Sequence, residues 1–83
     1  MNPIKHQMTL ARMKAGQTGI VVHIAGGHGL ARRLQALGIR PGKKVMKMSS
    51  MFRSGPVTIQ IDNTQIALGF GISSKIMVEV DAE

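Results

Sequence analysis

Hydrophobic and polar positions alternate along most of this 83-residue chain with the two-residue period of β-strands. In residues 19–24, Ile20, Val22 and Ile24 share one face, and the segment is rich in β-branched residues. Similar segments recur further along the chain, separated by turn-forming residues. The pattern predicts about five short strands, over residues 19–24, 45–52, 57–61, 65–69 and 76–80.

One segment departs from this period and predicts a helix. Leu30, Leu34 and Leu37 stand at positions i, i+4 and i+7, which places them on one side of a helix over residues 30–37. Gly38 follows directly, and a glycine with left-handed backbone commonly ends a helix. The helix therefore interrupts an otherwise all-β chain after its first predicted strand.

Short antiparallel strands bury one apolar face most readily by curling up, because closure removes unpaired edges. We therefore expect one domain over residues 1–83, all-β with one short helix, in the form of a small SH3-like antiparallel β-barrel of about five strands. Residues 9–80 should form its core, flanked by flexible residues 1–8 and 81–83. The positions expected to be mostly buried are Ile20, Val22, Ile24, Leu30, Leu34, Leu37, Val45, Val57, Ile59, Ile61, Ile66, Leu68, Ile76 and Val78.

Charge is distributed unevenly along the chain. The formal net charge is +7, because residues 1–53 carry +10 and residues 54–83 carry −3. This balance favours a negatively charged partner such as a nucleic acid, an anionic lipid or an acidic protein, and a solvated basic surface is the alternative. Phe52 and Phe70 are the only aromatic residues, so any nucleic-acid binding would rest mainly on phosphate contacts.

The candidate partner-binding surface is a basic hairpin at residues 43–53, joined by two arginines on the outer side of the predicted helix. The hairpin combines positive charge, which steers a partner, with Met51 and Phe52 near its turn, which supply apolar contact. The alternative is an ordinary basic hairpin whose apolar residues face inward. The candidate residues are Arg32, Arg33, Lys43, Lys44, Lys47, Met51, Phe52 and Arg53.

Motifs for catalysis, nucleotides and metals are weak. The glycine-rich segment 25–29 lacks the third glycine of a dinucleotide-binding loop, and no second parallel strand follows it. The chain has no cysteine, and His6, His23 and His28 are far in sequence from every carboxylate. We expect no enzyme activity, no catalytic residues, no cofactor and no tight intrinsic metal site.

Four short motifs point to a family. They occur in one order along the chain: Arg33-Leu34, Leu37-Gly38-Ile39-Arg40-Pro41-Gly42, Gly55-Pro56-Val57 and Ile66-Ala67-Leu68-Gly69. Together with the spacing of glycines and apolar residues over roughly residues 9–80, they resemble the FeoA family of ferrous-iron transport proteins. The family offers no agreed catalytic or metal-binding residues to transfer to this sequence.

The resemblance implies an SH3-like barrel and a non-enzymatic accessory or regulatory subunit of bacterial ferrous-iron uptake. Its implied partner is FeoB, a large membrane transporter with a cytosolic G-protein domain. No segment has the continuous apolar length of a signal peptide or membrane span, so we expect a cytoplasmic protein, peripheral at the inner face of the membrane through the transporter. The alternative function is a basic SH3-like module that binds nucleic-acid backbone.

Overall fold

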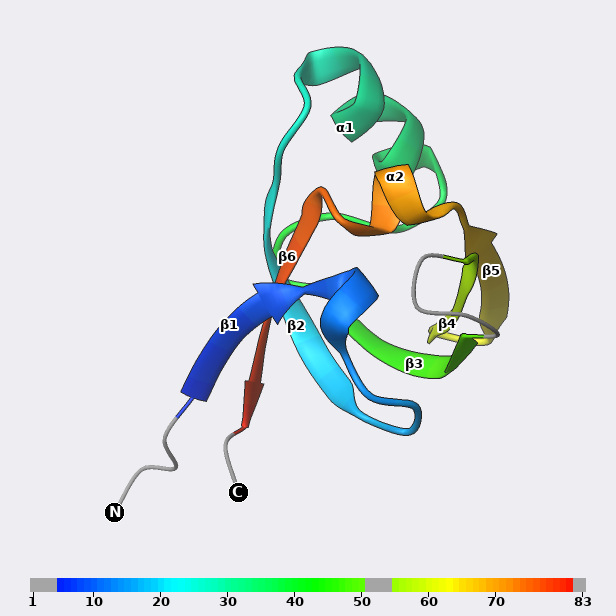
Figure 1. The fold of residues 1–83 in the computed structure, drawn as a ribbon. Coiled ribbons are helices and arrows are strands. Elements are labelled where there is room, and N and C mark those ends of the chain that lie inside the picture. Colours follow the sequence, from blue (N-terminus) through cyan, green and yellow to red (C-terminus); the bar gives the residue numbers. More distant parts are fainter. Residues whose placement is uncertain (1–4, 51–54, 82–83) are drawn as a thin grey trace.

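One antiparallel sheet of six strands, in the spatial order β1-β6-β2-β3-β4-β5, forms most of the protein (Figure 1). This computed structural model describes residues 5–50 and 55–81. The strands are β1 (Lys5–Thr9), β2 (Thr18–Ile24), β3 (Lys44–Ser50), β4 (Val57–Ile61), β5 (Thr64–Leu68) and β6 (Ile76–Asp81). The helical elements are the 3-10 turn η1 (Leu10–Arg12), α1 (His28–Ala36) and the four-residue α2 (Phe70–Ser73). Within these residues, no helix is long and apolar enough to cross a membrane.

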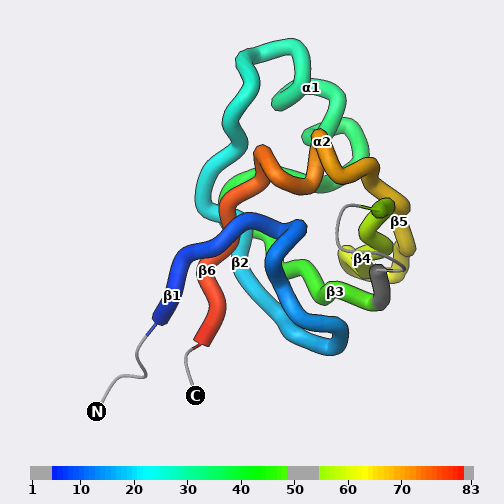
Figure 2. The backbone as a smooth tube through the Cα atoms, in the orientation of Figure 1, coloured from blue at the N-terminus to red at the C-terminus, as the bar shows by residue number. Residues whose placement is uncertain are grey.

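The sheet curls into a barrel-like, SH3-like shape (Figure 2). Strands β2 to β5 pair in chain order, and β6 then returns to lie between β1 and β2. Among residues 5–50 and 55–81, no pairing joins the two edge strands, β1 and β5, so the described sheet stays open. The prediction of an antiparallel SH3-like fold with one short helix is confirmed. The described sheet differs from the prediction because it is open and has six strands instead of about five.

The additional strand is β1, which lies in a segment without the alternating pattern of a strand. Its residues, Lys5 to Thr9, are mostly polar and only Met8 packs against the core. The strand pairs with β6 from Lys5 opposite Asp81 to Thr9 opposite Met77. Backbone hydrogen bonds to β6, rather than burial of its own side chains, therefore account for this strand.

Strand β2 begins with the opposite face inward from the one predicted. Val21 is 1% exposed, whereas Ile20 is 36% exposed. Gly19 occupies the other inward position, where a Cβ would meet β6 at 2.9 Å. A bulge between Val21 and His23 then shifts the register, and Ile24 packs against the core as predicted.

Helix α1 ends in a Schellman motif, which decides which residue enters the core next. Gly38 has φ +90° and its N–H bonds the carbonyl of Gln35 at 2.9 Å, while the N–H of Ile39 bonds the carbonyl of Leu34 at 2.9 Å. The prediction for Gly38 is confirmed. This turn buries Ile39 completely and leaves Leu37, a predicted core residue, 49% exposed.

The core otherwise follows the predicted apolar positions. Nine of them are buried: Leu30, Leu34, Val45, Val57, Ile59, Ile61, Leu68, Ile76 and Val78. Ile24 and Ile66 are partly buried against this core, and Val22 is half-buried. The buried apolar residues that the prediction missed are Leu10, Met13, Val21, Ile39 and Val80.

Candidate functional site

The structure describes the first strand, β3, of the predicted basic hairpin. Lys44 is exposed there. Lys43 is half-buried, and its Nζ donates to both carboxylate oxygens of Asp62, at 3.2 and 2.9 Å. This ion pair offsets one of the charges expected to steer a partner. Met51, Phe52 and Arg53 lie outside the described residues, and their docking role stays a prediction.

Lys47, predicted to belong to the same surface, is instead buried. Only 3% of the residue is exposed, and its Nζ donates hydrogen bonds to the backbone carbonyl of Ala11, at 2.9 Å, and to that of Met13. Val45 and Lys47 share the inward face of β3, so the alternation of the strand accounts for the burial. The apolar stem of Lys47 lies in the interior while its ammonium finds carbonyl partners.

The backbone of Lys47 holds the same neighbouring segment. The N–H of Gly16 donates to the carbonyl of Lys47 at 2.7 Å, and the N–H of Lys47 donates to the carbonyl of Gln17 at 3.0 Å. Within the segment, the side chain of Gln17 accepts a hydrogen bond from the N–H of Lys14 at 2.9 Å. Residues 13–17, which we call the η1–β2 loop, are therefore fixed against β3 through Lys47.

Burial lowers the pKa of the Lys47 ammonium below its ordinary value of 10.5, because the charged form loses solvation. Between the lowered folded pKa and 10.5, the unfolded chain binds a proton that the folded protein does not. Stability contributed by Lys47 therefore rises with pH across that window, and it is constant below the folded pKa.

We accordingly expect the unfolding free energy of the wild type to increase relative to that of Lys47→Met as pH is raised toward about 10.5. Met replaces the apolar stem of Lys47 but has no titratable group. The difference in unfolding free energy between the two proteins therefore isolates the contribution of this ammonium. Denaturant unfolding of both proteins at several pH values measures it. A difference that falls with pH contradicts the assignment of a buried, desolvated Lys47.

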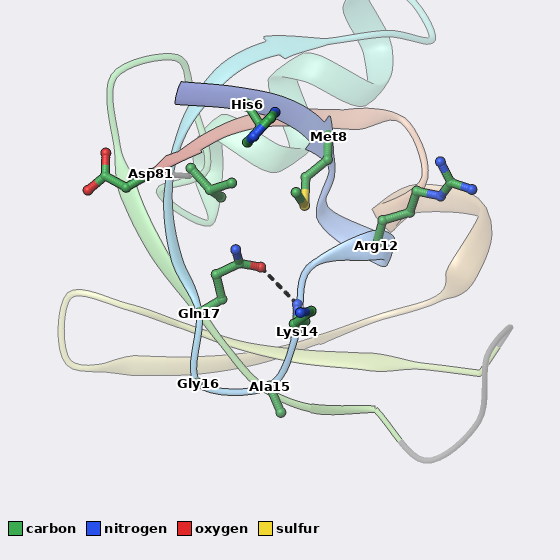
Figure 3. Close-up of a pocket in the computed structure, with 9 residues that line it drawn as sticks. His6, Met8, Arg12, Lys14, Ala15, Gly16, Gln17 and Asp81 are labelled. Carbon is green, nitrogen blue, oxygen red and sulfur yellow. Dashed lines mark hydrogen bonds between the residues drawn. The ribbon is translucent and has the colours of Figure 1, made fainter. Parts of the chain in front are cut away.

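A hollow of about 460 Å³ opens where β1, the end of β6, η1 and the η1–β2 loop meet (Figure 3). We call it the basic hollow. It is lined by His6, Met8, Arg12, Lys14, Ala15, Gly16, Gln17, Val80 and Asp81. His6 and Met8 are two residues apart in β1 and so share one face of the sheet. The pairing of β1 with β6 places His6 opposite Val80.

Charged groups in the basic hollow lie on different sides of it. Arg12 belongs to η1 and Lys14 to the η1–β2 loop, and Asp81 lies across from Arg12 in the close-up, where these two side chains extend away from each other (Figure 3). All three residues are exposed. Met8 is half-buried against the core and supplies apolar surface in the hollow, and Val80 lies buried beneath this lining. The hollow thus presents positive charge beside an apolar surface.

Sequence reasoning missed the basic hollow because its parts belong to no motif. Arg12 and Lys14 are near one another in sequence, but Asp81 joins them only through the pairing of β1 with β6. The one available signal was the cluster of basic residues in the first part of the chain, and it gave no position in space.

The two arginines predicted for the partner surface, Arg32 and Arg33, are exposed on α1. Helix α1 lies at the end of the molecule away from the free ends of β1 and β6 (Figure 1). Arg33 also lines a hollow of about 440 Å³ beside Lys75 at the glycine-rich start of the helix. Their position on the surface agrees with the sequence prediction, and their contact with a partner stays a prediction.

Among residues 5–50 and 55–81, no three His, Cys, Asp or Glu side chains gather closely enough to hold a metal ion. The basic hollow contains His6, Met8 and Asp81, but Arg12 and Lys14 in the same hollow repel a cation. The absence of a tight ferrous-iron site on the isolated protein stays a prediction, and calorimetry with Fe(II) tests it.

Comparison with protein families matches residues 8–80 to the FeoA domain. The chain belongs to the FeoA family. The FeoA match spans the core from Met8 to Val80, and it agrees with the resemblance read from the sequence over residues 9–80. Two residues of the basic hollow, His6 and Asp81, flank the matched region.

Relatives of this FeoA chain are known in sequence and in structure. A Methanocaldococcus jannaschii protein named as Fe(2+) transport protein A is 42% identical over 74 residues, covering 89% of this chain and 87% of its own. The crystal structure of an iron uptake regulatory protein, FeoA, is 34% identical with a TM-score of 0.79, and the match covers 88% of this chain and 95% of that one.

A third relative supports the description of the fold. The zinc-complexed FeoA of Stenotrophomonas maltophilia, described as an SH3 domain protein, is 25% identical with a TM-score of 0.74. The match covers 86% of this chain and 88% of that one. Association with Fe(2+) transport and an SH3-like fold are therefore properties of the family to which this chain belongs.

Proposed function

We propose that this FeoA-family protein is a non-enzymatic accessory subunit of ferrous-iron uptake that docks on the cytosolic side of the membrane transporter FeoB. The observation that carries the proposal is the match of residues 8–80 to the FeoA domain, together with 42% identity to a protein named for Fe(2+) transport. A single small domain of this family can act on transport by binding the transporter, which itself supplies the membrane-spanning path.

The distribution of charge supports docking on an acidic surface. The chain carries a net charge of +7, and exposed basic residues occur on α1, at Arg32 and Arg33, and on β3, at Lys44. Exposed charges of one sign raise association rates more than they prolong a complex. We therefore assign these residues to steering, and we place the protein in the cytoplasm, peripheral to the membrane through its transporter.

Regulation rather than catalysis fits the chemistry of the described side chains. Lys47 is the residue whose pKa is clearly displaced, and its ammonium holds the backbone carbonyls of Ala11 and Met13. Displaced pKa values often mark catalytic groups, but this one has a structural explanation. The proposal therefore gives the protein a binding role.

Capture from native membranes tests the proposal. The tagged protein, incubated with detergent-solubilised membranes of its own cells, is expected to enrich FeoB over a mock-loaded resin, as measured by mass spectrometry. A variant with Arg32→Glu, Arg33→Glu and Lys44→Glu should enrich less FeoB because steering is lost, while its thermal midpoint stays close to that of the wild type.

The opposing function makes a different prediction. A module for nucleic-acid backbone would bind a mixed-sequence RNA in the micromolar range or better at physiological salt, with affinity that falls steeply as salt is raised. That result, with no enrichment of FeoB, would replace the transport proposal by nucleic-acid binding.

A further inference from the structure

We propose that the basic hollow is the contact site for the partner, and that it takes a short acidic peptide segment in which a carboxylate neighbours one apolar side chain. The inference rests on the proposed function, because we assign this segment to the cytosolic part of the transporter. It adds a position on this chain and a chemical class of ligand, neither of which follows from family membership.

The charges of the hollow select a carboxylate. Arg12 and Lys14 are both exposed, and they come from η1 and the short loop that follows it. The ion pairs found among residues 5–50 and 55–81 join Lys5 to Glu79 and Lys43 to Asp62, so neither involves these two cations. Each of these two cations can form a charge-assisted hydrogen bond with one carboxylate of a ligand.

The apolar surface of the hollow favours a peptide with an apolar side chain next to that carboxylate. Met8 is half-buried against the core, and Val80, which is 2% exposed, lies beside it on the neighbouring strand. A methionine adapts to the shape of a bound apolar group more readily than a branched residue does. A volume of about 460 Å³ is within the range of ligand sites and admits a few side chains.

Hydrogen bonds fix one side of the hollow before any ligand arrives. Lys47 holds the carbonyls of Ala11 and Met13 through its Nζ, and its backbone pairs with Gly16 and Gln17. The loop that carries Lys14 is therefore already ordered, so a ligand does not have to order it. Such pre-organisation lowers the entropic cost of binding.

Other ligand classes fit the hollow less well. Asp81 lies across the hollow from Arg12, where its carboxylate can accept a hydrogen bond from a peptide N–H, a donor that a phosphate backbone lacks (Figure 3). Among the residues that the structure describes, the lining holds no Phe, Tyr or Trp on which a base could stack. A peptide uses the cations, the apolar surface and Asp81 together, whereas a nucleic acid uses only the first.

Three blocked peptides test the chemistry of the site without the transporter. Each has a central triplet flanked by glycine and serine: Glu-Leu-Glu, Gln-Leu-Gln or Glu-Ser-Glu. In amide NMR titrations of the wild-type protein, the Glu-Leu-Glu peptide should shift the signals of residues 12–17 and of Met8 and Val80, and bind at least about tenfold more tightly than either relative. Equal binding of all three peptides, or shifts confined to other elements, overturns the proposal.

A pair of charge-matched variants tests the site with the transporter. Arg12→Glu with Lys14→Glu removes the carboxylate contacts, and Arg32→Glu with Lys44→Glu changes the net charge by the same amount elsewhere. In binding kinetics with the purified cytosolic domain of FeoB, the first variant should lose at least about tenfold in affinity, mainly through faster dissociation, whereas the second should mainly associate more slowly.

The outcomes separate this inference from the proposed function. If the wild type binds FeoB and the first variant binds as well as the second, the docking function stands and the hollow is not its contact site. If the wild type does not bind FeoB, the proposed function fails, and the inference about the transporter fails with it. Competition by a mixed-sequence RNA that displaces the Glu-Leu-Glu peptide and binds more tightly overturns the choice of a peptide ligand.

Discussion

Leu34→Ala is expected to lower the unfolding free energy by about 2–5 kcal/mol, because it removes a fully packed side chain from the contact between α1 and the sheet. Leu34 is 2% exposed and belongs to the single buried cluster of the described residues. Since a small domain has only about 5–15 kcal/mol of stability in total, this loss should be visible as a large fall in the denaturant midpoint.

Leu37 provides the matched control in the same helical region. It lies at the C-cap of α1 and is 49% exposed, so Leu37→Ala removes the same atoms with little loss of packing. Its expected effect is within about 0.5 kcal/mol. Equal effects of the two substitutions would show that α1 packs in another orientation.

The contrast between these two leucines shows how far the helix was predictable. Both have the i, i+4, i+7 spacing with Leu30, and periodicity alone predicts that both are buried. The left-handed Gly38, with φ +90°, turns the chain one residue after Leu37 and sends Ile39 into the core instead. The glycine was recognised as a helix end, but the packing of the residue beyond it depends on the tertiary fold.

The first part of β2 shows why strand faces are harder to predict than strands. Ile20 and Val22 are apolar like Val21, so alternation does not say which of them faces inward. The close approach of β6 to Gly19 fixes the inward face, and the bulge before His23 changes it again. Both are contacts between segments far apart in sequence. Where polar residues alternate cleanly with apolar ones, as in β4, the prediction was correct.

In the candidate site, too, local sequence predicted some residues correctly and missed those whose position depends on distant contacts. The charge of Lys44, Arg32 and Arg33 predicted exposure correctly, since charged side chains rarely leave water. Lys47 is the exception. It lies on the inward face of β3, and its ammonium finds the carbonyls of Ala11 and Met13, which are 36 and 34 residues earlier in the chain and so beyond any local pattern. Polar strand β1, which brings His6 into the basic hollow, was equally invisible because sheet pairing rather than apolar patterning creates it.

The second large effect is expected from Lys47→Glu, which should destabilise the protein by about 3–5 kcal/mol. The substitution exchanges a buried donor for a carboxylate that faces the carbonyl oxygens of Ala11 and Met13, and neither of these oxygens can donate a hydrogen bond to it. Protonation of the new carboxyl relieves part of the cost, so the loss of stability should shrink as pH is lowered. Chemical denaturation at neutral and acidic pH measures both parts.

Lys44→Glu, on the same strand, is the control for Lys47→Glu because it reverses the same charge at an exposed position. Its effect on stability should stay within about 0.5 kcal/mol. If the two substitutions cost the same, Lys47 is a surface residue of the basic hairpin, as the sequence alone suggested, and the η1–β2 loop is held by other contacts. If only Lys47→Glu has a large cost, the buried ammonium of Lys47 holds in place the loop that carries Lys14. One side of the basic hollow then depends on this ammonium.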